Sequence, residues 1–309
     1  MQDSYVCRIC HDSSRRSHPY PTSTQVQVVL MEHATVAYAP DRSVSLGYRW
    51  HGGAPSSLPL VCLHGSMCDT AFFDLLDGAL PGYRCLCIEL PGHGSSDPVP
   101  GAPVALEQMA SAIRSLLVEL GLTTSDWAIA GHSLGGAVAL LVIELTATKP
   151  LVEAERLPLF FLSVEGNATP ADCAAGGLSR RVAAMPQPPS AEETLQMVSS
   201  EAVWLASARD IGETVGLLAH GIWISLVEWC DGRTLDGANL EEMQRRVPLR
   251  YLYGSKSGKY HESNQAAIAA HPDARAAGVE GAGHFMLTDD PPAALAAVRE
   301  LLAGFLSKE

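Results

Sequence analysis

The amino-acid sequence predicts an α/β protein with a mostly parallel β-sheet that is covered by helices on both faces. Short apolar runs of strand length alternate with longer segments of helical periodicity, which is the pattern of such sheets. Several of these runs end in glycine-rich loops that carry polar side chains. In one long interval, residues 166–247, helical stretches interrupt the alternation, so we expect a helical cap inserted between the sixth and seventh strands.

The expected strands are of two kinds. The first pair is partly polar and is separated by a short turn, which favours a hairpin. The later runs are continuously apolar, as are strands that are buried on both faces of a parallel sheet. The expected strand segments are 35–39 and 45–52, followed by 58–65, 83–94, 127–130, 157–166, 247–255 and 274–281.

Helical periodicity marks the segments between the strands. Leu106, Met109, Ala110 and Ile113 repeat at the spacing i, i+3, i+4 and i+7, and Gly121 ends this amphipathic helix. Further helices are expected over 68–80, 134–148 and 293–306, and within the cap over 191–208 and 211–230.

The same pattern predicts the domain organisation. Residues 31–167 and 247–309 are expected to form the α/β core. Residues 168–246 are expected to form the helical cap, unless the inserted helices only thicken the core. Residues 1–30 are polar, contain Ser and Pro, and are expected to be a disordered extension without a secretion signal.

A short motif in the extension offers an alternative. Cys7, Cys10 and His11 spell C-x-x-C-H, the attachment motif of a c-type haem. Attachment of such a haem requires export, for which the sequence has no signal, and a zinc site would need further ligands, of which only His18 is near. We therefore expect no metal and no cofactor.

Removal of residues 1–30 is expected to leave activity and thermal stability nearly unchanged, because the predicted core begins after them. The truncated and full-length chains can be compared by turnover and by thermal melting. A large loss in the truncated chain, or haem or zinc bound to the purified full-length chain, would contradict this interpretation.

Composition narrows the class of function. The chain has 34 acidic and 21 basic residues among 309, a net charge of −13, which disfavours nucleic acid and anionic membranes as partners. No apolar run approaches the roughly 20 residues of a membrane span. Cys62, Cys85 and Cys87 lie inside apolar runs, as small core residues do, which favours a reducing, cytoplasmic location. The expected partner is a small-molecule substrate.

The segment WAIAGHSLGGAVALLVIEL (127–145) predicts a sharp turn from a strand into a helix. Such a turn forces the residue at its apex, Ser133, into a strained conformation with positive φ. Gly131, Gly135 and Gly136 leave room for the strand and the helix to approach each other. The Ser133 hydroxyl would then stand beside the first N–H groups of a helix, a typical position for a nucleophile. The alternative is an ordinary glycine-rich turn that contains a serine.

Four segments in this order resemble the α/β-hydrolase family. They are LHGSMCD (63–69), ELPGHGSSD (89–97), GHSLGG (131–136) and GAGHFMLTDDP (281–291), and the resemblance extends from about Thr35 to Leu306. The resemblance implies the α/β-hydrolase fold and a catalytic triad with Ser133 as its nucleophile.

A serine hydroxyl needs a base within hydrogen-bond reach. The resemblance implies that His284 is this base, since it follows the last strand in a Gly-Ala-Gly-His loop. His64 and His93 are expected to shape the turns in which they lie, and His132 is expected to point away from the serine.

An oxyanion hole needs two N–H groups aimed at the developing negative charge. By resemblance these are the amides of Leu134, directly after the nucleophile, and of Ser66, with Met67 as the adjacent alternative. Candidate substrate contacts are Met67 and three residues of the cap, Trp204, His220 and Trp223.

The acid of the triad departs from the commonest pattern of the family. Most relatives carry an Asp where Ser257 stands, and a hydroxyl cannot hold a negative charge beside an imidazolium. Glu165 follows the preceding strand, and some relatives, haloalkane dehalogenases among them, have their acid there. We therefore assign Glu165 as the acid. The alternatives are Asp172, another carboxylate, or Glu165 as a mere helix-cap acid.

These residues predict a serine hydrolase that cleaves an ester, a thioester or a lactone of a small, partly apolar substrate through an acyl-enzyme. One alternative is a C–C bond hydrolase with the same triad. Another is a non-catalytic member of the fold that binds a small ligand. Loss of the usual Asp favours this binding role, whereas the persistence of the serine, the histidine and the oxyanion loop disfavours it.

Overall fold

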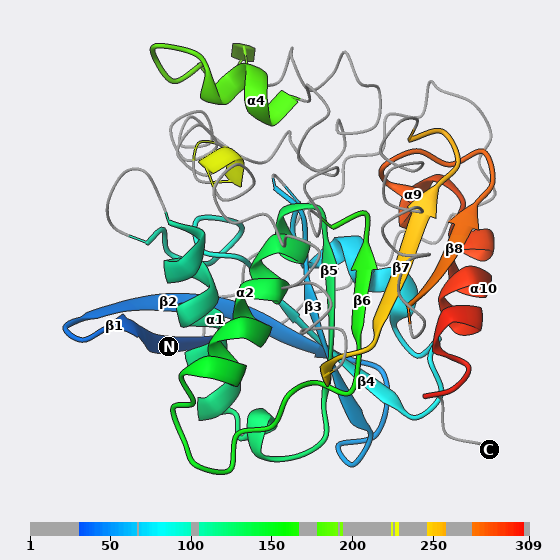
Figure 1. Cartoon of the computed structure of the whole chain (residues 1–309), viewed down its shortest axis with the longest axis horizontal. Coiled ribbons are helices and arrows are strands. Elements are labelled where there is room, and N and C mark those ends of the chain that lie inside the picture. Colours follow the sequence, from blue (N-terminus) through cyan, green and yellow to red (C-terminus); the bar gives the residue numbers. More distant parts are fainter. Residues whose placement is uncertain are drawn as a thin grey trace.

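The fold is built around one β-sheet (Figure 1). A computed structural model of the chain describes residues 31–66, 68–99, 105–166, 178–190, 192–193, 224, 226–228, 246–257 and 274–305. In this part of the chain the sheet has eight strands in the order β1-β2-β4-β3-β5-β6-β7-β8.

The directions of the strands agree with the sequence analysis. β1 (Glu32–Ala39) and β2 (Arg42–His51) form an antiparallel hairpin, and β2 also pairs antiparallel with β4 (Tyr83–Ile88). The other pairs are parallel. They join β4 to β3 (Leu58–Leu63) and continue through β5 (Ala128–His132), β6 (Phe161–Val164), β7 (Leu249–Gly254) and β8 (Arg275–Val279). The predicted mostly parallel sheet is therefore confirmed.

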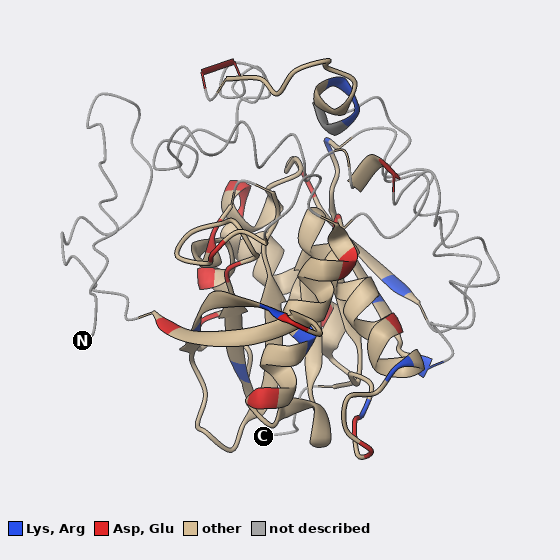
Figure 2. Ribbon diagram, turned by 90° about the vertical axis from the view of Figure 1, so that its left-hand side faces the viewer, with Lys and Arg blue, Asp and Glu red and all other residues tan. Residues whose placement is uncertain are grey.

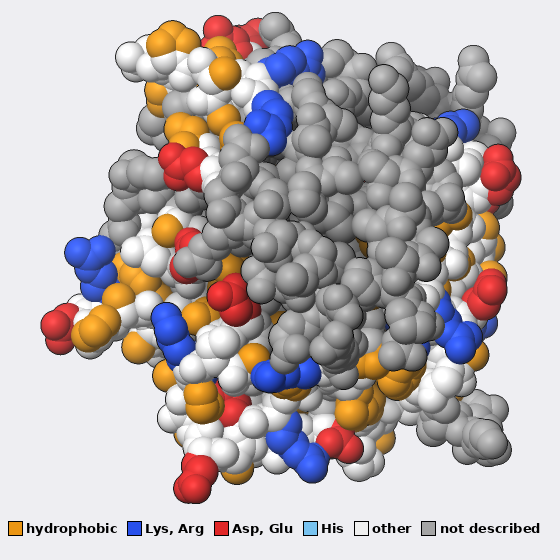
Figure 3. Space-filling model, viewed as in Figure 1, with side chains coloured by type: hydrophobic (Ala, Val, Ile, Leu, Met, Phe, Trp, Pro, Cys, Tyr) orange, Lys and Arg blue, Asp and Glu red, His pale blue; other side chains and the backbone are white. Residues whose placement is uncertain are grey.

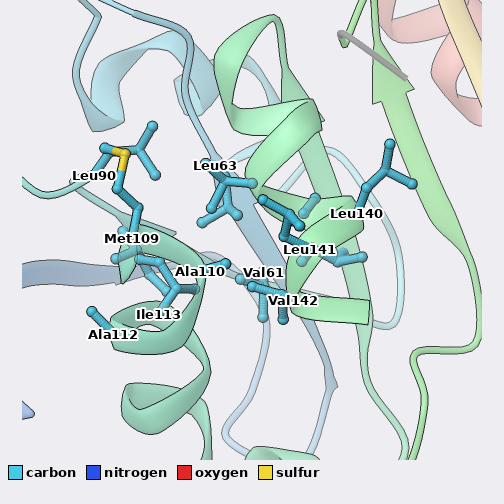
Figure 4. Close-up of a cluster of buried hydrophobic side chains, with 14 of the residues drawn as sticks. Val61, Leu63, Leu90, Met109, Ala110, Ala112, Ile113, Leu140, Leu141 and Val142 are labelled. Atoms are coloured by element: carbon cyan, nitrogen blue, oxygen red, sulfur yellow. The ribbon is translucent and has the colours of Figure 1, made fainter. Parts of the chain in front are cut away.

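Helices cover both faces of the sheet, and each face has its own hydrophobic cluster. On one face lie α1 (Leu106–Glu119) and α2 (Leu134–Thr148). On the other face lie η1 (Thr70–Leu76), α9 (Met286–Asp289) and α10 (Pro291–Leu302). In Figure 4 the side chains of Val61 and Leu63 from β3 lie between those of α1 and those of α2. Cys62, Cys85 and Cys87 are buried on the face of η1, as predicted.

Some elements differ in extent or type from the expected ones. The strand expected over 83–94 ends at Ile88, because Pro91 and Gly92, which has a φ of 79°, turn the chain. The helix expected over 68–80 is the 3₁₀ helix η1. The residues buried on it are Thr70, Phe72, Phe73 and Leu76, of which Thr70, Phe73 and Leu76 follow the 3₁₀ spacing of three residues.

The chain between β6 and β7 is described only in part. Helix α4 (Leu178–Ala183) lies on the side of the sheet toward which the parallel strands point, above α2 in Figure 1 and at the top of Figure 2. The helices expected over 191–208 and 211–230 lie largely outside the described residues, and the expected extension 1–30 lies wholly outside them.

Charged residues of both signs occur in the described part of the chain. Basic and acidic side chains are scattered over the ribbon in Figure 2. On the face seen in Figure 3, hydrophobic side chains lie in small groups among polar and charged ones. None of the helices in the described ranges has both the length and the hydrophobicity that crossing a bilayer requires.

Candidate active site

Ser133 stands at the strained corner between β5 and α2. Its φ of 50° and ψ of −119° confirm the positive φ expected from the sequence. The flanking glycines permit this corner, because a Cβ on Gly131 would lie 2.5 Å from the carbonyl oxygen of Gly135. A Cβ on Gly135 would lie only 2.1 Å from the carbonyl oxygen of Leu63, so the helix touches the end of β3.

Glu165 is strained in the same way at the end of the neighbouring strand. It follows β6 directly and has a φ of 41°. Within the described part of the chain, Ser133 and Glu165 are the only residues other than glycine with positive φ. The amide of Ser133 donates a hydrogen bond to the carbonyl of Val164 at 3.3 Å. The two strained residues therefore lie at the ends of adjacent strands. Such strain costs of the order of 1–3 kcal/mol per residue and clusters at functional sites.

The carboxylate of Glu165 is held through both of its oxygens. Oε2 lies 2.7 Å from Nδ1 of His284, and Oε1 accepts a hydrogen bond of 2.8 Å from the amide of Gly254. Glu165 is 7% exposed, whereas the His284 side chain is 35% exposed. Because an ionised carboxylate only accepts hydrogen bonds, Nδ1 of His284 carries the shared proton in this contact.

The loop that carries His284 is fixed by several backbone contacts. The amide of Gly283 donates to Oδ2 of Asp289 at 2.8 Å, and the amide of Lys256 donates to the carbonyl of Ala282 at 2.9 Å. A Cβ on Gly254 would lie 2.2 Å from the carbonyl oxygen of Gly283. The end of β7 therefore packs directly against this loop and helps to place the imidazole.

The predicted oxyanion loop lies against the serine. A Cβ on Gly65 would lie 3.2 Å from Cβ of Ser133. Nδ1 of His64 donates to the carbonyl of Gly65 at 2.7 Å, while its Nε2 accepts from the amide of Leu90 at 3.0 Å. Burial lowers the pKa of His64 to about 4, so the ring is neutral at pH 7 and suits both contacts. His64 thus ties this loop to the end of β4, as a turn-shaping residue should.

Both expected oxyanion residues belong to this neighbourhood. Leu134 is the first residue of α2, so its amide is among those that have no acceptor within the helix. Ser66 follows Gly65 and is buried. The side chains expected to contact substrate, Met67, Trp204, His220 and Trp223, lie outside the described residues, as does the alternative acid Asp172.

Two contacts were not anticipated from the sequence. One is the amide of Gly254, which no side-chain pattern marks as a partner of Glu165. The other is Nε2 of His132, which lies 3.1 Å from the carbonyl oxygen of His284. In the described ranges, no cluster of three or more His, Cys, Asp or Glu side chains is arranged to hold a metal ion, and Cys7, Cys10 and His11 lie outside these ranges.

The mostly parallel sheet and the strand–serine–helix corner define the chain, by class, as an α/β hydrolase. A sequence model described as "Alpha/beta hydrolase family" matches residues 60–298, so the chain belongs to this family. The family and the α/β-hydrolase fold of the core that the sequence predicts are confirmed.

Individual relatives carry the names of hydrolases. The chain is 26% identical over 282 residues to the mouse sn-1-specific diacylglycerol lipase ABHD11. The aligned region covers 85% of this chain and 86% of that protein. It is 35% identical over 88 residues to the human serine hydrolase-like protein. The aligned region covers 28% of this chain and 42% of that relative, so the match spans less than half of the relative. A solved structure of an esterase from Thermogutta terrifontis shares the fold, with a TM-score of 0.66 at 21% identity, covering 89% of this chain and 100% of that chain.

Proposed function

We propose that the protein is a serine hydrolase that cleaves the carbonyl–oxygen or carbonyl–sulfur bond of an ester, thioester or lactone. The observation that carries this proposal is the 2.7 Å contact between Glu165 and His284, beside the strained corner that presents Ser133. A lipase and an esterase among the similar proteins support the reaction class.

The reaction begins at Ser133. Its Oγ attacks the substrate carbonyl while Nε2 of His284 takes the hydroxyl proton. The amides of Leu134 and Ser66 stabilise the oxyanion, and the Glu165 carboxylate stabilises the imidazolium through Nδ1. His284 then gives its proton to the leaving alkoxide or thiolate. Water, deprotonated by His284, attacks the acyl-enzyme and releases the acid and the free serine. No metal or organic cofactor takes part.

The substrate side of the site is assigned to the inserted segment. Residues 31–167 and 247–309 serve as the catalytic core, and residues 168–246 act as a cap over the carboxyl ends of the strands. The placement of α4 on the side of the sheet toward which the parallel strands point supports this role. Met67, Trp204, His220 and Trp223 are proposed to contact a partly apolar acyl or alcohol group.

A fluorophosphonate probe tests the proposal, because it phosphonylates only an activated serine. The full-length chain should be labelled on Ser133, as mapped by mass spectrometry, and the Ser133→Ala variant should not be labelled. Absence of label from the wild-type chain would contradict the proposal and favour a ligand-binding role.

A second measurement identifies the class of bond that the protein cleaves. p-Nitrophenyl esters of rising chain length, acyl-thioesters and lactones should include at least one class that the wild-type chain turns over. Labelling of Ser133 without turnover of any of them would contradict the ester, thioester or lactone assignment and favour C–C bond hydrolysis with the same triad.

A further inference from the structure

The buried ring of His132 contacts three parts of the site at once. Its Nε2 lies 3.1 Å from the carbonyl oxygen of His284, and its ring centroid lies 4.6 Å from that of His284. On another side it stacks on Phe72 of η1, with a centroid distance of 4.1 Å and an interplanar angle of 22°. On a third side lies the oxyanion loop, since a Cβ on Gly65 would be 2.6 Å from Nδ1 of His132.

These contacts allow only one form of the ring. A carbonyl oxygen only accepts hydrogen bonds, so Nε2 of His132 must carry a proton. Burial, with a smaller contribution from the neighbouring His284, lowers the pKa of His132 well below its usual value, so Nδ1 is bare. Nδ1 is buried and has no hydrogen-bond partner among the described residues, so a proton there would be unsatisfied.

We propose that His132 is a positioning residue of the hydrolase, whose neutral, Nε2-protonated ring holds the His284 loop and the oxyanion loop in register with Ser133. This inference rests on the proposed function, since it assigns His284 the role of base. His132 is the last residue of β5 and directly precedes the nucleophile, so its contacts fix both loops relative to the end of this strand. A neutral donor also avoids a second positive charge next to the imidazolium that His284 becomes during the reaction.

The form of the ring is tested without any activity assay. Long-range ¹H–¹⁵N NMR spectra of the ¹⁵N-histidine-labelled full-length chain distinguish the two neutral tautomers and the imidazolium. His132, assigned by comparison with the His132→Gln variant, should show the neutral Nε2–H pattern from pH 5 to 8. An imidazolium or an Nδ1–H tautomer in this range would overturn the proposal, even if the protein is an active serine hydrolase.

A matched pair of variants tests the positioning role. The amide nitrogen of glutamine reaches as far from the backbone as Nε2 of histidine, so His132→Gln keeps the donor to His284, whereas His132→Phe keeps a flat ring and removes the donor. Misplacement of a catalytic group costs up to about 10²-fold in rate. His132→Phe should therefore lower kcat by roughly 10- to 100-fold at little change in KM. His132→Gln should stay within about threefold of the wild type.

Controls separate positioning from simple loss of packing. Thermal melting of both variants shows whether each is folded, and the rate of fluorophosphonate labelling of Ser133 should fall with kcat. Equal kcat values for His132→Phe and the wild type would overturn the proposal. Losses of kcat that follow the melting temperature of both variants, without rescue by glutamine, would also overturn it. Failure of the wild-type chain to react with the probe would instead contradict the proposed hydrolase function.

Discussion

Replacement of Ser133 by alanine is expected to lower turnover by about 10⁴- to 10⁶-fold, because the acyl-enzyme can no longer form. The residual rate would come from the oxyanion hole and substrate binding alone. The measurement is kcat on the best substrate of the ester, thioester and lactone panel, at saturating concentration. KM should change little, since the hydroxyl contributes to the transition state more than to substrate binding.

The fold of this variant should remain intact. Alanine keeps the Cβ that serine already places at a φ of 50°, so the strain at the corner is unchanged. Thermal melting should therefore agree with the wild type. A useful control is Ser66→Ala, which removes a hydroxyl from the oxyanion loop but keeps the proposed backbone donor. Its turnover should remain within about tenfold of the wild type. Near-normal hydrolysis by Ser133→Ala would contradict the mechanism.

The sequence predicts those parts of the site that local geometry determines. The corner at Ser133 could be predicted because glycines flank one serine between an apolar run and a helical run, as a tight strand-to-helix turn requires. The parallel sheet followed from the same alternation of runs. Glu165 could be proposed as the acid only with the help of the family resemblance, since some relatives carry their acid after this strand and Ser257 cannot carry charge.

Contacts between distant segments are not encoded in any local pattern. The amide of Gly254 meets Glu165 only because β6 and β7 pair in one particular register, with Val164 opposite Leu252. His132 meets the carbonyl of His284 across 152 positions of the chain. The 3₁₀ form of η1 depends on which side chains pack against the sheet, and its apolar content alone suited an α-helix equally well.

Replacement of Glu165 by glutamine is expected to lower kcat on the order of 10³- to 10⁴-fold, by analogy with the loss of the acid in other triads. The amide has nearly the shape of the carboxylate, and its oxygen can still accept from the Gly254 amide. It lacks the negative charge that stabilises the imidazolium of His284. Its NH₂ group also faces Nδ1 as a donor, which favours the wrong tautomer of His284. The change should appear in kcat, with thermal stability close to that of the wild type.

The position of Ser257 provides the matched test of this role. Its amide donates a hydrogen bond to the carbonyl of Gly254 at 3.1 Å, which places Ser257 at the end of β7. Its buried hydroxyl has no hydrogen-bond partner among the described residues. Ser257→Asp in the Glu165→Gln background would return a negative charge to this end of the sheet, and kcat should recover by roughly tenfold or more. Ser257→Asn, which adds the same volume without the charge, should give no recovery. Near-normal kcat in Glu165→Gln alone would show that another carboxylate orients His284, and Asp172 would be the next residue to replace.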